Sequence, residues 1–132
     1  MITQTITLRT RYGETDRMGY VYYGNYAQYY EVARVELMRS AGISYAELED
    51  SGIMMPVIDL QVKYIRPAYY DENLQITCMV KEKPGSRMKF EYQVFNSKNE
   101  LINSGSTTLV FVNKSSGRPI RCPEVILEKF NF

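Results

Sequence analysis

Residues 11–26, RYGETDRMGYVYYGNY, separate a strand-like N-terminus from the one long helical pattern in this chain. The segment contains five tyrosines, three glycines and two carboxylates. It is too rich in glycine for a regular helix or strand, and too aromatic for an ordinary solvated loop. Asp16 lies in its middle. The rest of the chain shows what this segment connects.

A helix is predicted directly after it, over residues 26–41. Asn25 is a favourable N-cap residue, and Gln28 stands three positions later, as in a capping box. Gly42 is a natural stop after the last turn. Apolar residues recur at helical spacing and define one buried face: Tyr26, Tyr29, Tyr30, Ala33, Leu37 and Ala41.

Strand patterns occupy most of the remaining chain. Residues 3–12 alternate before the loop, and residues 58–64, 74–80, 88–94 and 101–113 alternate after a short capped helix at 44–52. Short turns join the four later strands, which predicts an antiparallel meander. Each strand has one apolar face, and the 26–41 helix is the only long element that can cover it. The fold class predicted is α+β, with a five-stranded antiparallel sheet wrapped around one long helix.

Length and composition indicate a single globular domain over residues 1–132, of which 45% are hydrophobic. A net charge of +1 gives no electrostatic footprint for nucleic acid. No apolar run is long enough for a membrane span, and the N-terminus lacks signal-peptide features. Cys78 and Cys122 are expected to be free thiols in the cytoplasm, although the sequence leaves a disulfide between them open.

The chain has no histidine. This excludes Ser-His-Asp and Cys-His catalysis and histidine-ligated zinc, so no metal site is predicted. An enzyme built from these residues works with carboxylates, backbone dipoles, Tyr, Lys or Arg.

Three segments resemble a known family. RYGETDRMGYVYYGNYAQYYEVAR looks like the signature of the 4-hydroxybenzoyl-CoA thioesterase-like acyl-CoA thioesterases, which have the hotdog fold. VKYIRPAYYDE is similar to the strand and Arg-Pro segment of that family, and TTLVFVNKSSGRPIRCP to its last strand and tail. Many relatives carry His where Tyr23 stands, whereas others carry Tyr.

The resemblance implies roles for individual residues. Asp16 is the catalytic carboxylate, and the backbone N–H groups at Tyr23 and Gly24 polarise the thioester carbonyl. It implies no cofactor, because coenzyme A is part of the substrate, and it implies a homodimer or homotetramer with active sites at the subunit interface. The substrate-binding candidates are Tyr12, Asn25, Glu31 and Arg66.

Thioester hydrolysis is chemically feasible with these groups. An alkyl thiol with a pKa of about 8.5 departs as a thiolate without a strong general acid. One carboxylate serves as nucleophile or as general base, and the sequence leaves both open for Asp16. The first N–H groups of a helix lack intrahelical partners and carry partial positive charge, so they suit an oxyanion.

Plainer interpretations stand beside these roles. Asp16 has the context of a turn-capping residue, the tyrosines suit core packing, and Glu31 suits a solvated helix surface near Arg34. Phosphates on coenzyme A favour Arg and Lys, which makes Arg66, Lys63, Arg87 and Lys89 candidates. The alternative functions are an acyl-carrier-protein thioesterase with the same site, and a non-catalytic hotdog module that binds an acyl ligand.

Overall fold

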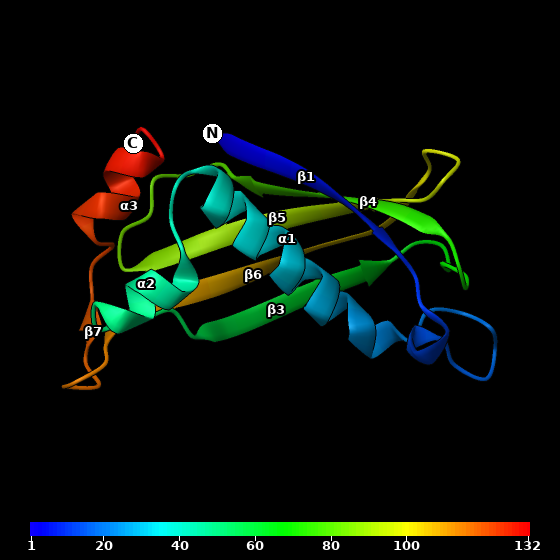
Figure 1. Ribbon diagram of the computed structural model, residues 1–132, viewed down its shortest axis with the longest axis horizontal. Coiled ribbons are helices and arrows are strands. Elements are labelled where there is room, and N and C mark those ends of the chain that lie inside the picture. The colour runs from blue at the N-terminus through cyan, green and yellow to red at the C-terminus, as the bar shows by residue number, and fades with distance from the viewer.

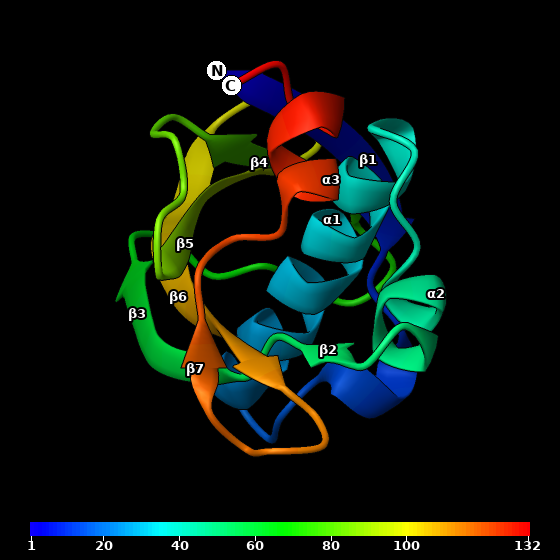
Figure 2. The ribbon, with the colours of Figure 1, turned by 90° about the vertical axis from the view of Figure 1, so that its left-hand side faces the viewer.

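The computed structural model describes residues 1–132. One long helix lies against the concave face of a curved sheet, and two short helices flank it (Figures 1 and 2). This confirms the predicted α+β class. The strands are β1 Ile2–Arg9, β2 Ile53–Met54, β3 Val57–Tyr64, β4 Asn73–Val80, β5 Arg87–Phe95, β6 Leu101–Asn113 and β7 Pro119–Ile120, and the helices are η1 Tyr12–Glu14, η2 Tyr23–Asn25, α1 Tyr26–Ser40, α2 Tyr45–Asp50 and α3 Glu124–Lys129.

Five long strands form the antiparallel sheet in the order β1-β4-β5-β6-β3, and β2 and β7 extend it along the end of β6. The meander is confirmed for β4, β5 and β6 and is wrong for β3, which pairs with β6 instead of β4. The connection at residues 65–72 is not a hairpin, because its backbone bonds the loop after β1: Val21 N–H donates to the Ala68 carbonyl at 2.8 Å. β3 therefore forms one edge of the sheet.

The core lies between α1 and the sheet. The predicted helix face is buried except for Ala41, which is half-buried. Tyr30 stacks on Tyr92 of β5 with ring centroids 4.2 Å apart and planes within 1° of parallel. Gly105 of β6 makes this packing possible, because a Cβ there would lie 2.6 Å from the Tyr30 hydroxyl.

A chain of polar side chains crosses this core. The Arg34 guanidinium on α1 is buried and donates from Nη1 to the Tyr92 hydroxyl at 3.1 Å. Tyr92 Oη and Thr107 Oγ1 share a hydrogen bond of 2.6 Å. Arg34 has no ion pair with any carboxylate, so α1 carries an uncompensated cation into the core.

The helix does not cover the whole inner face of the sheet. α1 lies nearest to β1 and β4, at the opposite side of the sheet from β3. Ile58, Leu60 and Tyr64 of β3 stay about half exposed. The expectation that α1 covers every apolar face is therefore wrong for β3, because one helix is narrower than a five-stranded sheet.

Local capping signals were partly right. Ser44 accepts the N–H of Glu47 at 3.4 Å, as expected for the cap of α2. Asn25 does not cap α1, because its own backbone is helical (φ −74°, ψ −18°) and η2 precedes the helix. Both cysteines are free, as predicted, and both are buried. No helix has the length and apolar character that crossing a membrane requires.

Candidate active site

The loop between β1 and α1 is tied to the segment between β3 and β4. The buried Thr10 hydroxyl donates to the Tyr69 carbonyl at 2.5 Å and accepts the Glu72 N–H at 2.9 Å. An isolated bridge between Tyr20 and Tyr69 continues this contact, and a second bridge, between Thr15 and Val21, closes the loop on itself. The two segments therefore meet at the end of the sheet where α1 begins (Figure 1).

Asp16 opens a tight turn in this loop. Gly19 N–H donates to the Asp16 carbonyl at 3.0 Å, and Gly19 has φ +82°, which favours glycine. The Asp16 carboxylate accepts through Oδ1 from the N–H groups of Met18 at 2.9 Å and Tyr20 at 3.2 Å. One carboxylate oxygen thus caps the turn, as the plainer interpretation holds. The other, Oδ2, has no hydrogen-bond partner in the chain and is available to a ligand.

The approach to α1 presents free backbone donors. The N–H groups of Tyr23 and Gly24 make no hydrogen bond within the chain, since they begin η2 and no preceding carbonyl reaches them. The Tyr23 carbonyl accepts from the Tyr26 N–H and from the Tyr64 hydroxyl, the latter at 3.1 Å. Gly24 leaves little space for a side chain, because a Cβ there would lie 2.8 Å from the Tyr22 ring.

Between the loop, the helix start and the end of β3 lies a pocket of about 330 Å³. Its wall is mainly aromatic and aliphatic, and Asp16 is its only carboxylate. The lining residues are Asp16, Met18, Tyr20, Val21, Tyr23, Tyr26, Tyr64, Ile65, Arg66 and Pro67.

Two tyrosines of this wall have a raised pKa. Burial raises the pKa of Tyr26 to about 12, with smaller contributions from Tyr64 and Glu72. Burial and the neighbouring Tyr23 raise the pKa of Tyr64 as well. Both hydroxyls therefore stay protonated at neutral pH, and that of Tyr64 donates to the Tyr23 carbonyl. Asp16 is the one lining group that can attack a carbonyl carbon or accept a proton there.

The predicted site residues separate into two groups. Asp16, Tyr23 and Arg66 line the pocket, and Gly24 follows Tyr23 directly. Tyr12 does not line this pocket but borders a second hollow of about 440 Å³, which Asp16 also lines, and its ring is edge-on to Tyr70 at 5.7 Å.

Two further candidates lie outside the pocket. The Asn25 side chain donates from Nδ2 to the Glu14 carbonyl at 2.7 Å and so braces the loop against the helix. Glu31 is exposed on α1 and lines none of the hollows described here. Substrate-binding roles for Asn25 and Glu31 stay predictions.

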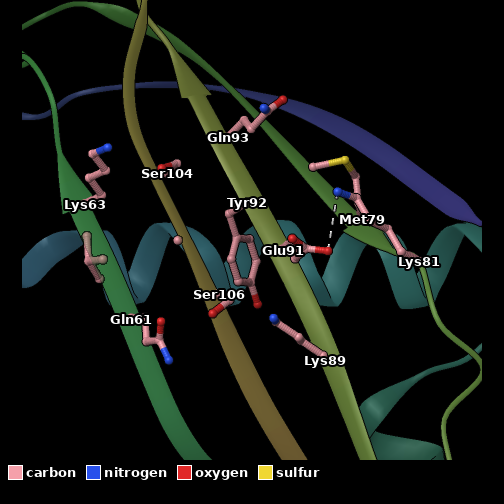
Figure 3. A pocket seen from close by; sticks show the side chains of 12 residues that line it. Gln61, Lys63, Met79, Lys81, Lys89, Glu91, Tyr92, Gln93, Ser104 and Ser106 are labelled. Carbon is pink, nitrogen blue, oxygen red and sulfur yellow. Dashed lines mark ion pairs between the residues drawn. The ribbon is translucent and has the colours of Figure 1, made fainter.

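The cationic candidates are divided between the two faces of the sheet. Arg66 borders the pocket and also a polar hollow of about 200 Å³, where its Nη1 lies 3.7 Å from Glu100 Oε2. Lys63 and Lys89 line a polar hollow of about 410 Å³ on the outer face of the sheet, away from α1 (Figure 3). Arg66 is therefore the one of these three that adjoins Asp16. No cluster of three or more His, Cys, Asp and Glu residues could hold a metal ion.

Several wall residues were not identified as site residues from the sequence. Tyr64, Ile65 and Pro67 come from the end of β3, and Met18 and Tyr20 from the turn itself. The sequence does show that the Ile65-Arg66-Pro67 run follows a strand. That this run lies beside Asp16 can be inferred only when the order of the strands in the sheet is known.

Known proteins resemble this chain in sequence and in fold. Residues 10–130 match the thioesterase-like superfamily. YneP of Bacillus subtilis, provisionally named an acyl-CoA thioesterase, is 32% identical over 86% of this chain and 83% of its own. YbgC of Escherichia coli, an acyl-CoA thioester hydrolase, is 29% identical over 93% of this chain and 92% of its own. The crystal structure of a DHNA-CoA thioesterase from Staphylococcus aureus superposes with a TM-score of 0.94 at 36% identity, covering 99% of this chain and 90% of the other.

Proposed function

The chain belongs to the thioesterase-like superfamily, has the hotdog fold and is a thioester hydrolase, and from this premise we propose that it hydrolyses small-to-medium acyl- or aroyl-coenzyme A esters at the Asp16 pocket. The carrying observation is the isolation of Asp16. It is the only carboxylate in a mainly apolar pocket, its Oδ2 is free, and the pocket lies beside the unpaired N–H groups of Tyr23 and Gly24.

The proposed reaction uses these groups in two steps. Asp16 Oδ2 either attacks the thioester carbon or takes a proton from a water that attacks it, while the carbonyl oxygen becomes an oxyanion. Donors such as the Tyr23 and Gly24 N–H groups are worth about 3–4 kcal/mol each when they point at that oxygen. Collapse of the tetrahedral intermediate breaks the C–S bond and releases coenzyme A as a thiolate. In the covalent route, water then hydrolyses the acyl-aspartyl anhydride.

The shape of the pocket supports the substrate class. A volume of about 330 Å³ is at the small end for ligand pockets, which favours a short or flat acyl group over a long chain. Tyr20, Tyr23, Tyr26 and Tyr64 offer ring edges and faces to an aromatic acyl group. Arg66 at the rim is a candidate for the phosphates of coenzyme A.

The test is the Asp16→Asn variant, assayed for thiol release on a panel of acyl- and aroyl-CoA esters. The amide keeps an oxygen for the turn N–H groups but can neither attack nor accept the proton. We expect kcat to fall by about 10³-fold or more on the best substrate. Asp50→Asn, at the exposed end of α2, is the matched control. Activity of Asp16→Asn within a few-fold of wild type would refute the assignment.

A single turnover in H₂¹⁸O tests the nucleophile role of Asp16: ¹⁸O in the Asp16 peptide identifies the nucleophile route, whereas ¹⁸O in the acid alone fits the general-base route and also attack of water on the acyl carbon of the anhydride. In the nucleophile route, water can attack the aspartyl carbon of the anhydride. The acid product of the first turnover then carries an unlabelled oxygen from the carboxylate, and mass spectrometry finds ¹⁸O in the peptide that contains Asp16. The general-base route puts ¹⁸O in the acid alone.

A second copy of the chain is the proposed partner. β3 is an edge strand whose inner row, Ile58, Leu60 and Tyr64, is half exposed. Edge pairing with another β3 would satisfy its free backbone groups and place the partner's apolar row beside this one. This supports a homodimer, with the homotetramer a pairing of dimers. Sedimentation of Leu60→Lys tests the proposal: it should be monomeric where wild type is not. Kinetics on acyl-carrier protein beside acyl-CoA test the alternative substrate.

A further inference from the structure

Tyr64 joins the end of β3 to the start of α1. Its hydroxyl donates to the Tyr23 carbonyl at 3.1 Å. Its ring is held edge-on against the buried Tyr26, with centroids 5.7 Å apart, and against Tyr23 at 6.3 Å. The half-exposed ring thus packs on two neighbours, and its hydroxyl is hydrogen-bonded before any ligand arrives.

The bonded carbonyl belongs to the same peptide unit as the Gly24 N–H. In a trans peptide the C=O and N–H bonds point in opposite directions and lie in one rigid plane, and the chain has no cis peptide bond. A donor that fixes the direction of the Tyr23 carbonyl therefore fixes the direction of the Gly24 N–H. Hydrogen bonding at the oxygen also polarises the unit and makes its N–H a stronger donor.

The hydrogen bond from Tyr64 matters for Gly24 because no side chain of Gly24 packs against the protein to hold its N–H in one direction. η2 is a single turn with one buried neighbour at its end, and Gly24 has no side chain to pack. The Tyr23 carbonyl otherwise accepts only the Tyr26 N–H. Without the Tyr64 hydroxyl, the bond from the Tyr26 N–H is the one hydrogen bond left to hold the direction of this peptide.

We propose that Tyr64 is a positioning residue that aims and polarises the Gly24 N–H toward the thioester oxygen. The inference rests on the proposed function, since it names a residue that acts through the proposed oxyanion donor. Tyr64 stays protonated in this role, because the raised pKa of its hydroxyl keeps it a donor across the neutral range.

The test compares Tyr64→Phe with Tyr69→Phe. Phenylalanine keeps the ring against Tyr26 and removes only the hydroxyl. Tyr69 is a matched control, because it is similarly exposed (50% against 52%), packs edge-on against Tyr20, and makes no hydroxyl hydrogen bond. For Tyr64→Phe we expect kcat to fall about 10-fold, part of the roughly 10²–10³-fold effect of losing an oxyanion donor outright, with KM changed less than about 2-fold.

A second readout does not depend on turnover. The Gly24 amide ¹⁵N resonance should move in Tyr64→Phe, because a hydrogen bond at the preceding carbonyl polarises that nitrogen, and it should stay in place in Tyr69→Phe. A role in packing alone predicts a lower melting temperature with unchanged kcat and an unmoved Gly24 resonance.

The outcomes separate this inference from the proposed function. If Asp16→Asn is inactive while Tyr64→Phe keeps wild-type kcat, the thioesterase proposal stands and the positioning role is overturned. If Asp16→Asn retains activity, the proposed site is overturned, and the positioning role falls with it. A reduced kcat at constant KM, together with a shifted Gly24 resonance, supports it.

Discussion

Replacing Gly105 by alanine should loosen the sheet at the point where α1 packs most closely on it. A Cβ at residue 105 would lie 2.6 Å from the Tyr30 hydroxyl, 2.7 Å from a Tyr30 ring carbon, and closer still to the Gln61 carbonyl of β3. Ordinary contacts need about 3.4 Å or more. Tyr30 cannot yield, because it is fully buried and stacked on Tyr92, and the Gln61 atom is backbone.

Overpacking of this kind lowers the free energy of unfolding by about 1–3 kcal/mol. The upper figure applies here, because neither the Tyr30 side chain nor the Gln61 backbone can move aside. With an unfolding entropy of about 2.1 cal/mol/K per residue, the 132 residues of this chain convert about 3 kcal/mol into a decrease of roughly 10 °C in Tm. Circular dichroism or calorimetry measures this directly.

Gly85→Ala is the matched control, because its Cβ would meet only the Arg121 Nη2 atom, at 3.7 Å. We expect that variant to melt within about 2 °C of wild type. A Gly105→Ala protein that melts as late as the Gly85→Ala protein would show that β3 and Tyr30 move apart freely, and would refute the close packing described above.

Three further outcomes are expected. Burial raises the pKa of the Cys78 thiol to about 12, so iodoacetamide at pH 8 should leave Cys78 unmodified in the native protein, as judged by mass spectrometry. The pKa of Tyr26 is raised to about 12 from an unfolded value near 10. The folded state therefore holds this proton more tightly, and denaturant titrations should show stability that is constant below about pH 10 and falls as the pH rises toward 12. Arg34→Met should unfold within about 1 kcal/mol of wild type, because it removes a buried unpaired cation while keeping its volume, and Tyr92 keeps its bond to Thr107.

Local patterns predicted the elements well. The helix ends one residue earlier than expected, at Ser40, and β6 has the predicted bounds. These segments carry strong periodicity over many residues. The short elements β2, β7 and α3 were not predicted, since two strand residues or one and a half turns of helix leave no periodic signal.

The predictions were wrong where the structure of a segment depends on residues far away in the sequence. Nothing in the β3 sequence indicates that it pairs with β6, because its alternation is the same in either position. Asn25 has the right residue type for a cap, but it lies within η2, and its side-chain amide donates to the Glu14 carbonyl instead. The position of Asp16 within a mainly apolar pocket likewise depends on the end of β3, which supplies Tyr64, Ile65 and Arg66.

The strand order also determines when the sheet can assemble. Ile2 pairs with Val80, and Tyr64 pairs with Asn103, so both edge strands wait for partners that come much later in the chain. During synthesis β1 and then α1 emerge before the rest of the sheet, so the tyrosine face of α1 is at first uncovered. Only the β4-β5-β6 hairpins can form from neighbouring residues. A topology dominated by such distant pairings folds slowly. Each new molecule therefore has a period in which the apolar faces of its helix and its first strand are exposed. During that period these faces offer a chaperone its largest binding surface.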